Sequence, residues 1–206
     1  DLLRQWAQEA GFPCAVDSMG NMFIRRAGKN PQLAPVLTGS HVDSQPLGGR
    51  YDGIYGVLAG LEALRTLNER GIETERDIVL VNWTNEEGAR FAPAMLASGV
   101  WAGQFSEAFA LARKDRDGIS VGAALEAIGY RGERPTAAFP VHACYEVHIE
   151  QGPILEEEDV DIGLVHAAMG QRWFTLTLDG FAAHAGTTPM HSRRDALTAF
   201  AELALK

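Results

Sequence analysis

Apolar residues recur along the chain at two different spacings, which predict alternating helices and strands. Between residues 53 and 70 they follow the three- and four-residue spacing of a helix, and Gly71 is a natural helix stop. Residues 78–81 form a continuous apolar run, typical of a strand that is covered on both faces. The same patterns predict further strands at 21–26, 36–40 and 145–149 and further helices at 1–10 and 120–128.

This alternation predicts an α/β fold with a mostly parallel sheet flanked by helices, over residues 1–166. From about Ala167 the pattern changes to a strand with a period of two at 172–178, a Gly/Thr/Pro loop and a helix from Arg194. We therefore expect 167–206 to begin a second, α+β domain. The chain starts without methionine and stops inside a helical pattern, so we expect it to be a truncated piece of a longer protein.

The composition indicates which kinds of partner the protein has and in which cellular compartment it is found. The formal charge of −9 argues against nucleic acid and anionic membranes as partners. No run approaches the ~18 apolar residues that cross a bilayer. The chain has two cysteines, too few for a fold held together by disulfides, and this favours a reducing, cytoplasmic location.

Four glycine-containing stretches follow predicted strands, and each carries a side chain that can bind a metal ion. These candidates are His41, Asp52, the pair Glu86 and Glu87, and His148. Because functional residues of α/β proteins gather beyond the carboxyl ends of strands, we expect them to meet. Imidazole and carboxylate together suit zinc, manganese, nickel or cobalt.

Residue types suggest how such a site would work. Asp43, two residues after His41, could orient that imidazole ring. Asp52, on a glycine-flanked turn, could bridge two cations, while one of the adjacent glutamates binds metal and its neighbour reaches the attacking water. Each feature also has a plainer interpretation, as a satisfied polar histidine, a helix cap or a solvated acidic loop, and spacing alone leaves these open.

Five ordered motifs add a family resemblance. They are Gly39-Ser40-His41-Val42-Asp43-Ser44, Gly48-Gly49-Arg50-Tyr51-Asp52-Gly53, the segment 82–91, His148-Ile149-Glu150-Gln151-Gly152-Pro153 and the segment 183–190. From about residue 36 to the end, the chain resembles the hydantoinase/carbamoylase family of amidases. That family belongs to the aminoacylase and carboxypeptidase superfamily of dinuclear metallohydrolases, so the resemblance implies a zinc exopeptidase-like catalytic domain followed by a lid and dimerisation domain.

The resemblance implies a set of metal ligands in this chain. His41 and His148 would be terminal ligands on different ions, the Asp52 carboxylate would bridge the ions, and Glu87 would be a further ligand. The family also implies a cis peptide between Asp52 and Gly53 that places the bridging carboxylate. The cofactor would be two divalent ions per site, zinc first, with manganese, nickel or cobalt as alternatives.

The resemblance also implies catalytic roles. Glu86 would be the general base that takes a proton from the metal-bridging water and later delivers it to the leaving nitrogen. Gln151 would contact the substrate, and His184 would bind substrate and stabilise the tetrahedral oxyanion.

The implied reaction is hydrolysis of the linear C–N amide of a small N-carbamoyl (ureido) amino acid to the amino acid, CO2 and NH3. The alternatives are an allantoate or ureidoglycolate amidohydrolase, then an aminoacylase or peptidase, and a non-catalytic descendant that keeps the fold. Relatives form homodimers and carry a further histidine ligand, an Asn and an Arg that would lie beyond Lys206. Residues 1–206 alone are therefore expected to be inactive.

Overall fold

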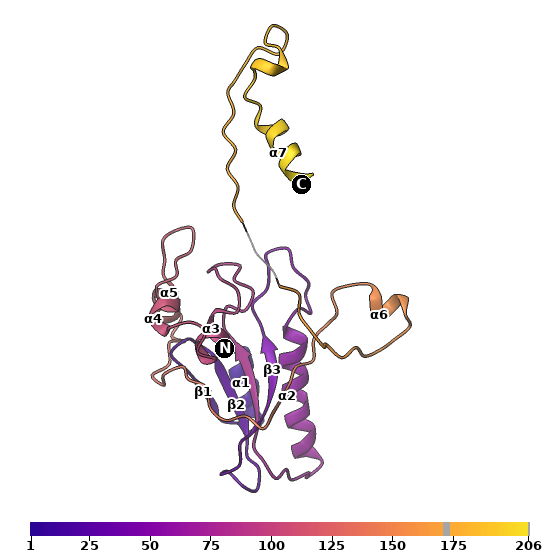
Figure 1. Cartoon of the computed structure of the whole chain (residues 1–206). Coiled ribbons are helices and arrows are strands. Elements are labelled where there is room, and N and C mark those ends of the chain that lie inside the picture. Colours follow the sequence, from indigo (N-terminus) through magenta and orange to yellow (C-terminus); the bar gives the residue numbers. More distant parts are fainter. Residues whose placement is uncertain (171–173, 206) are drawn as a thin grey trace. The chain divides into compact units, whose positions relative to one another are not determined.

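The computed structural model describes residues 1–170 and 174–205, which divide between Val160 and Asp161 into two compact units (Figure 1). The first unit contains α1 (Leu2–Glu9), β1 (Cys14–Val16), β2 (Met22–Arg26), β3 (Val36–His41), α2 (Ile54–Glu69), β4 (Ile78–Trp83), α3 (Leu96–Trp101), α4 (Glu107–Leu111), α5 (Val121–Ala127), β5 (Ala143–Tyr145) and α6 (Ile154–Glu157). The second unit contains the 3-10 helix η1 (Met190–Ser192) and α7 (Ala196–Ala204). None of the helices in the described ranges has the length and apolar character that a membrane span requires.

The first unit is built on one sheet with the strand order β1-β2-β4-β3-β5. β3 runs parallel to both β4 and β5, whereas β2 runs antiparallel to β1 and to β4. The α/β class is confirmed, and the sheet is mixed because β2 runs antiparallel to both of its neighbours, to β1 across a short hairpin connection and to β4. β3 and β4 are parallel because α2 forms the crossover between them.

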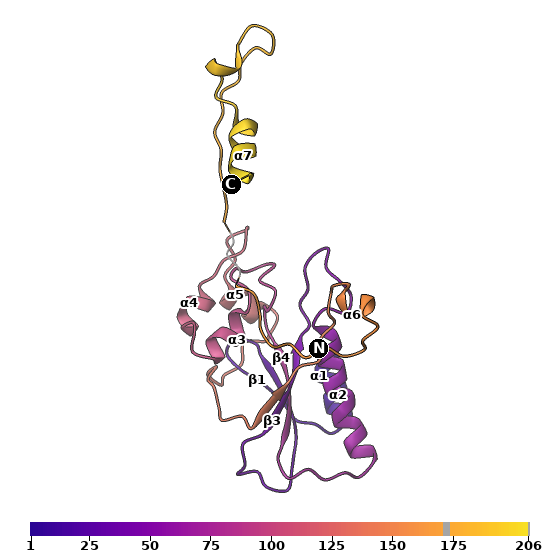
Figure 2. The ribbon, with the colours of Figure 1, turned by 45° about the vertical axis from the view of Figure 1, so that its right-hand side comes forward.

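Helices α1 and α2 cover one face of the sheet (Figure 2). Leu61 and Leu64 of α2 pack with Ile24 of β2 and Leu80 of β4, and all four are buried. Gly60 lets the helix approach closely, since a Cβ there would meet the Leu80 side chain at 2.6 Å. Burying each large apolar side chain contributes about 1.5–3 kcal/mol, so this layer fixes α2 and the loop that precedes it.

The short helices α3, α4 and α5 form a separate apolar cluster together with Met19 and Phe91. The side chains of Ser106 and Ser120 cap α4 and α5 by accepting hydrogen bonds from backbone N–H groups. The predicted helix at 120–128 is confirmed. α3 and α4 have only six and five residues, too few for a periodic pattern to predict them.

The predicted strand at 145–149 is wrong in its position, because β5 ends at Tyr145. Beyond that residue the chain leaves the sheet. The Ser40 hydroxyl donates a hydrogen bond to Glu146 at 2.5 Å, and the chain then turns so that His148 faces the end of β3.

In the second unit, residues 174–178 of the predicted strand 172–178 form no strand, and 171–173 lie outside the described residues. An alternating pattern becomes a strand only where a neighbouring strand supplies hydrogen bonds. The predicted helix is confirmed as α7, whose first turn is capped by Asp195 through the N–H groups of Leu197 and Thr198. The division into a catalytic domain 1–166 and a second domain from 167 stays a prediction.

Candidate metal and catalytic site

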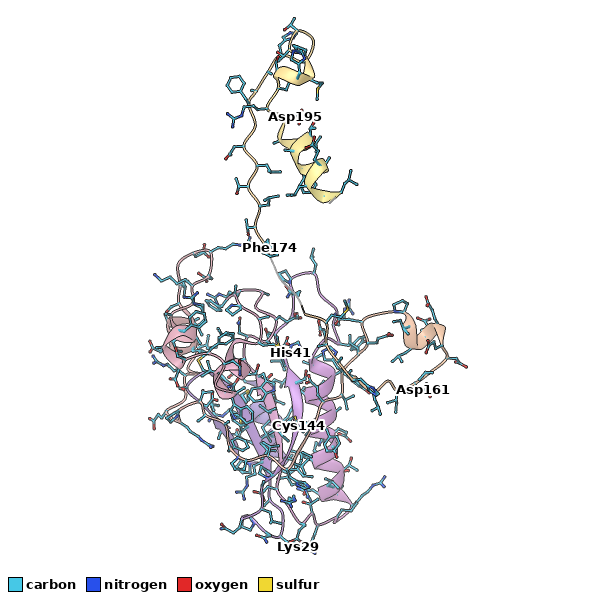
Figure 3. The ribbon with its side chains drawn as sticks, in the orientation of Figure 1. Lys29, His41, Cys144, Asp161, Phe174 and Asp195 are labelled. Atoms are coloured by element: carbon cyan, nitrogen blue, oxygen red, sulfur yellow. The ribbon has the colours of Figure 1, made fainter. Side chains whose placement is uncertain are left out.

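The carboxyl ends of the parallel strands position most of the predicted site residues. His41 is the last residue of β3, and Figure 3 labels it. Glu86 and Glu87 follow β4, and His148 follows β5. Asp52 lies just before α2, the crossover helix, so four separate segments reach one edge of the sheet.

His41, Asp52 and His148 bring one ligand atom each to within 4.8 Å of one another. The Asp52 Oδ1 atom lies 3.1 Å from His148 Nε2 and 3.8 Å from His41 Nε2. His41 and Asp52 are only 3% and 8% exposed, whereas His148 is open to solvent on one side. The cluster is therefore a partly enclosed group of donors at the surface of the first unit.

The remaining ring nitrogens define how the two imidazoles face Asp52. His41 Nδ1 lies 2.8 Å from the Asp43 carbonyl oxygen, and His148 Nδ1 lies 2.7 Å from the Ile149 carbonyl oxygen. A carbonyl only accepts, so each Nδ1 carries a proton, and in the neutral ring each Nε2 presents a lone pair. Two lone pairs then face a carboxylate oxygen, an arrangement that a divalent cation stabilises.

The two glutamates border this group. Glu86 Oε2 lies 3.4 Å from His41 Nε2. The Oε1 atom of Glu87 is buried without a hydrogen-bond partner among the described residues. Leaving such an acceptor unsatisfied costs about 1–3 kcal/mol. The donor set and this unpaired oxygen both fit divalent metal ions.

Asp52 is held in its ionised form by its neighbours. Burial alone would raise its pKa, but the Gln151 amide and the Glu87 carboxyl group contact the carboxylate and act against burial. The positive charge that each of His148 and His41 carries when protonated acts in the same direction, and the pKa of Asp52 lies below its ordinary value. The group that would bridge two cations is thus a carboxylate at neutral pH.

Glu86 shows the opposite shift. Burial raises its pKa above the ordinary value, and the charge of His41 only partly offsets this. The acidic neighbours Glu87, Asp43 and Glu146 raise it further. A carboxylate with increased proton affinity suits a group that must accept a proton near neutral pH.

Asp43 does not orient His41 through its carboxylate, as the spacing suggested. Its main-chain carbonyl oxygen accepts the hydrogen bond from His41 Nδ1–H, while its Oδ1 lies 3.7 Å from Nδ1. The carboxylate instead accepts hydrogen bonds from the backbone N–H groups of Glu86 at 3.2 Å and Glu87 at 3.1 Å. Asp43 therefore holds the loop after β4, a function that the two-residue spacing from His41 does not reveal.

Gln151 and Gly53 shape the surroundings of Asp52. Gln151 Nε2 donates to Asp52 Oδ2 at 2.9 Å, so this predicted substrate contact also supports a site carboxylate. The implied cis peptide between Asp52 and Gly53 is wrong, since the cis bond found in the described ranges joins Ala92 and Pro93. Gly53 has a φ of 65°, and a Cβ there would overlap the His41 ring, so only glycine lets ring and turn pack together.

His184 belongs to the second unit, in the loop before η1. Its Nδ1 accepts hydrogen bonds from the N–H groups of Gly186 at 3.0 Å and Thr187 at 3.1 Å. The ring proton is therefore on Nε2, which can donate to an oxyanion. Arg193 donates to the carbonyls of Thr188 and Ala185 at 2.8 and 2.7 Å and closes the loop.

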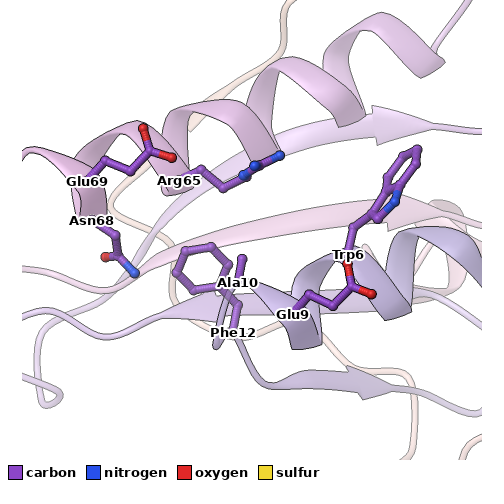
Figure 4. Close-up of a pocket in the computed structure, with 7 residues that line it drawn as sticks. All are labelled: Trp6, Glu9, Ala10, Phe12, Arg65, Asn68 and Glu69. Atoms are coloured by element: carbon purple, nitrogen blue, oxygen red, sulfur yellow. The ribbon is translucent and has the colours of Figure 1, made fainter.

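A different hollow, of about 280 Å³, lies between α1 and α2 (Figure 4). Arg65, Asn68 and Glu69 of α2 line it on one side, and Trp6 and Phe12 line it on the other. None of the predicted site residues lines this hollow, and the sheet edge that carries His41 remains the candidate site.

The chain belongs to peptidase family M20/M25/M40, whose family model matches residues 37–206. It is 52% identical over 202 residues to an N-carbamoyl-L-amino-acid amidohydrolase of Rhizobium meliloti, an alignment that covers 98% of this chain and 49% of that protein. It is 38% identical over 191 residues to an allantoate amidohydrolase of Bacillus subtilis, covering 92% of this chain and 46% of that protein.

A solved structure of an amidase of the hydantoinase/carbamoylase family from Burkholderia vietnamiensis matches with a TM-score of 0.87 and 56% identity. The match covers 98% of this chain and 49% of that one. The resemblance that the five motifs indicated is confirmed. The chain spans about half the length of the curated relatives and solved structures that it matches.

Proposed function

We propose that the protein to which this chain belongs is a metal-dependent amidohydrolase that cleaves the linear C–N amide of an N-carbamoyl amino acid. The observation that carries the proposal is the meeting of His41, Asp52 and His148 within 4.8 Å, with Glu86 3.4 Å from His41. The named relative from Rhizobium meliloti supports the substrate class. The products would be the amino acid, CO2 and NH3.

Two divalent ions are the proposed cofactor, with zinc as the first choice and manganese, nickel or cobalt as alternatives. His41, Asp52, Glu87 and His148 are the residues proposed to hold them, which is consistent with the inward lone pairs and with the unpaired Glu87 oxygen. When bound, such ions polarise a substrate carbonyl and lower the pKa of water.

Glu86 is the proposed general base and acid. Its carboxylate takes a proton from the water whose oxygen attacks the carbamoyl carbon. The same group then donates this proton to the terminal nitrogen as the C–N bond breaks, so that ammonia leaves. The carbamate that remains loses CO2 to give the free amino acid.

His184 and Gln151 are the proposed substrate contacts. The Nε2–H of His184 donates to the oxygen that becomes negative as the carbon turns tetrahedral. The Gly186 and Thr187 N–H groups support this role by keeping the proton on Nε2. Gln151 holds Asp52 with its amide nitrogen, which leaves its carbonyl oxygen to accept from the substrate.

The test is ammonia release by the full-length protein loaded with zinc or manganese. We expect turnover of N-carbamoyl amino acids, and a loss of about 10²–10⁴-fold in kcat for Glu86→Gln with unchanged metal content. Glu73→Gln, at an exposed glutamate, is the matched control and keeps wild-type kcat. A wild-type protein that binds metal but releases no ammonia from any ureido compound would refute the proposal.

Allantoate hydrolysis is the second candidate, because a relative with that name is 38% identical to the chain. Allantoate also carries ureido groups, so the same site chemistry would apply. A substrate panel with N-carbamoyl amino acids, allantoate and ureidoglycolate at equal concentrations separates the two by kcat/KM. A peptidase or aminoacylase would instead prefer N-acyl substrates.

A homodimer in the cytoplasm is the proposed state of the whole protein. The exposed apolar side chains Leu197, Phe200 and Leu203 on α7 support an interface in the second unit. Both cysteines, Cys14 and Cys144, are unpaired, which supports a reducing compartment. Sedimentation of the full-length protein tests the dimer.

A further inference from the structure

Gln45 lies in the loop between β3 and α2 and contacts the segment that carries the two glutamates. Its Nε2 donates to the Glu87 main-chain carbonyl at 3.2 Å and to Glu87 Oε2 at 3.0 Å. An amide nitrogen carries two hydrogens, so both are used on one residue. Gln45 thereby ties the Glu87 carboxylate to its own backbone.

Asp43, in the same loop, secures the other side of this segment through the N–H groups of Glu86 and Glu87. Two side chains of one loop therefore hold the N–H, the carbonyl and the carboxylate of Glu87. Because Asp43 already holds the backbone, the hydrogen bond from Gln45 to Oε2 restricts the rotation of the Glu87 carboxylate.

The two carboxylate oxygens of Glu87 consequently differ. Oε2 accepts from Gln45, whereas Oε1 is buried without a hydrogen-bond partner among the described residues. A carboxylate in which one oxygen accepts a hydrogen bond and the other has free lone pairs is suited to bind a cation through that second oxygen alone. Without the Gln45 donor, both oxygens would be available.

We propose that Gln45 is a positioning residue that makes Glu87 a one-oxygen metal ligand through Oε1. This role of Gln45 rests on the metal site of the proposed function. It adds that Gln45 determines how many oxygens Glu87 offers to the metal ion. Partners that hydrogen-bond to a metal ligand typically change metal affinity or activity by about 10–100-fold when removed. Gln45 is exposed, so its replacement does not disturb the core.

The test uses the full-length protein stripped of metal and titrated with Mn²⁺ by calorimetry. Gln45→Met keeps the side-chain length and removes the donor, and we expect affinity for the more weakly bound ion to fall about 10–100-fold. Gln45→Glu places a carboxylate against Glu87 and is expected to weaken binding at least as much. Gln8→Met, at an exposed glutamine of α1, is the matched control and keeps wild-type affinity.

Cobalt substitution reports on coordination directly. Release of Oε2 lets Glu87 bind through both oxygens, so the visible absorption of the Co²⁺ form of Gln45→Met should weaken as the coordination number rises. Thermal melting curves that match wild type establish that the variants are folded.

Wild-type affinity and a wild-type cobalt spectrum in both Gln45 variants would overturn the role of Gln45 and leave the metal site intact. Absence of Mn²⁺ and Co²⁺ binding by the wild-type protein would instead refute the metal site itself. The two failures are therefore distinguishable in the same experiment.

Discussion

The Nε2 atom of His148 lies 3.1 Å from Oδ1 of Asp52, and in the neutral ring, whose Nδ1–H donates to the Ile149 carbonyl, both atoms are hydrogen-bond acceptors. Such a pair repels unless a proton or a cation lies between the atoms. His41 meets the same oxygen from β3 at 3.8 Å. The folded chain thus brings together lone pairs from three segments around one carboxylate.

Asp52→Asn removes the negative charge that both imidazoles face. Removal of a residue that only hydrogen-bonds to a metal ligand typically lowers metal affinity by about 10–100-fold. We expect the metal affinity of the full-length Asp52→Asn variant to fall by more than this, and its activity to be lost with the metal. Metal content by elemental analysis after dialysis checks this. Asp117→Asn, at an exposed aspartate, should retain wild-type metal content, and a metal-replete Asp52→Asn protein would contradict the assignment of Asp52 as a ligand.

Asp43→Asn tests the support of the loop after β4. The asparagine side chain has one acceptor oxygen, so one of the N–H groups of Glu86 and Glu87 loses its partner. We expect kcat to fall about 10–100-fold, with little change in the proton position on His41, because the Asp43 carbonyl remains.

Steady-state kinetics of the full-length variant measure this effect. Ser44→Ala, in the same loop, is the control and should keep wild-type kcat. An Asp43→Asn enzyme with wild-type kcat would show that the two backbone hydrogen bonds do not position Glu86.

The sequence predicts most of the fold because its main elements have strong periodic patterns. The apolar faces of α2 and the continuous run of β4 determine which residues are buried, whatever lies around them. β5 ends at Tyr145, and Glu146 just beyond it pairs with Ser40, a long-range contact that no local pattern contains. Residues 174–178 alternate correctly but have no paired strand among the described residues.

The candidate site was predictable in its residue types and less so in its supporting contacts. His41 and the glutamates follow apolar strands, and adjacent parallel strands end at the same edge of a sheet. The hydrogen bonds of Asp43 and Gln45 depend on how the loop after β3 folds toward the loop after β4. Their side chains are common in loops for other reasons, so the sequence alone could not distinguish these contacts.

Leu64→Ala tests the packing of α2 on the sheet. Leu64 is fully buried between α2 and the strands, and its truncation leaves a cavity. We expect the free energy of unfolding to fall by about 2–5 kcal/mol. Urea unfolding followed by circular dichroism measures it, and Leu58→Ala, at a 40% exposed leucine of the same helix, should cost much less.

The ion pair of Asp77 with Arg25, which is not part of the candidate site, is expected to make the stability of the fold depend on pH. Burial would raise the pKa of Asp77, but the Arg25 guanidinium at 2.5 Å and the Gly28 N–H at 2.8 Å outweigh burial and hold the pKa below its ordinary value. A lowered folded pKa means that the ionised form stabilises the protein. This stabilisation is complete above the unfolded pKa of about 3.9 and disappears as the pH falls through the lower folded value.

Asp77→Asn should therefore lower the free energy of unfolding by about 1.5–3 kcal/mol at pH 7, the range for hydrogen bonds to charged groups. The difference from wild type should shrink as the pH falls below about 4, where Asp77 becomes protonated in the unfolded and then in the folded protein. Urea titrations between pH 7 and pH 3 measure this difference, with Asp117→Asn as the exposed control. A gap between Asp77→Asn and wild type that stays constant, or widens, toward pH 3 would contradict the ion pair with Arg25 as its source.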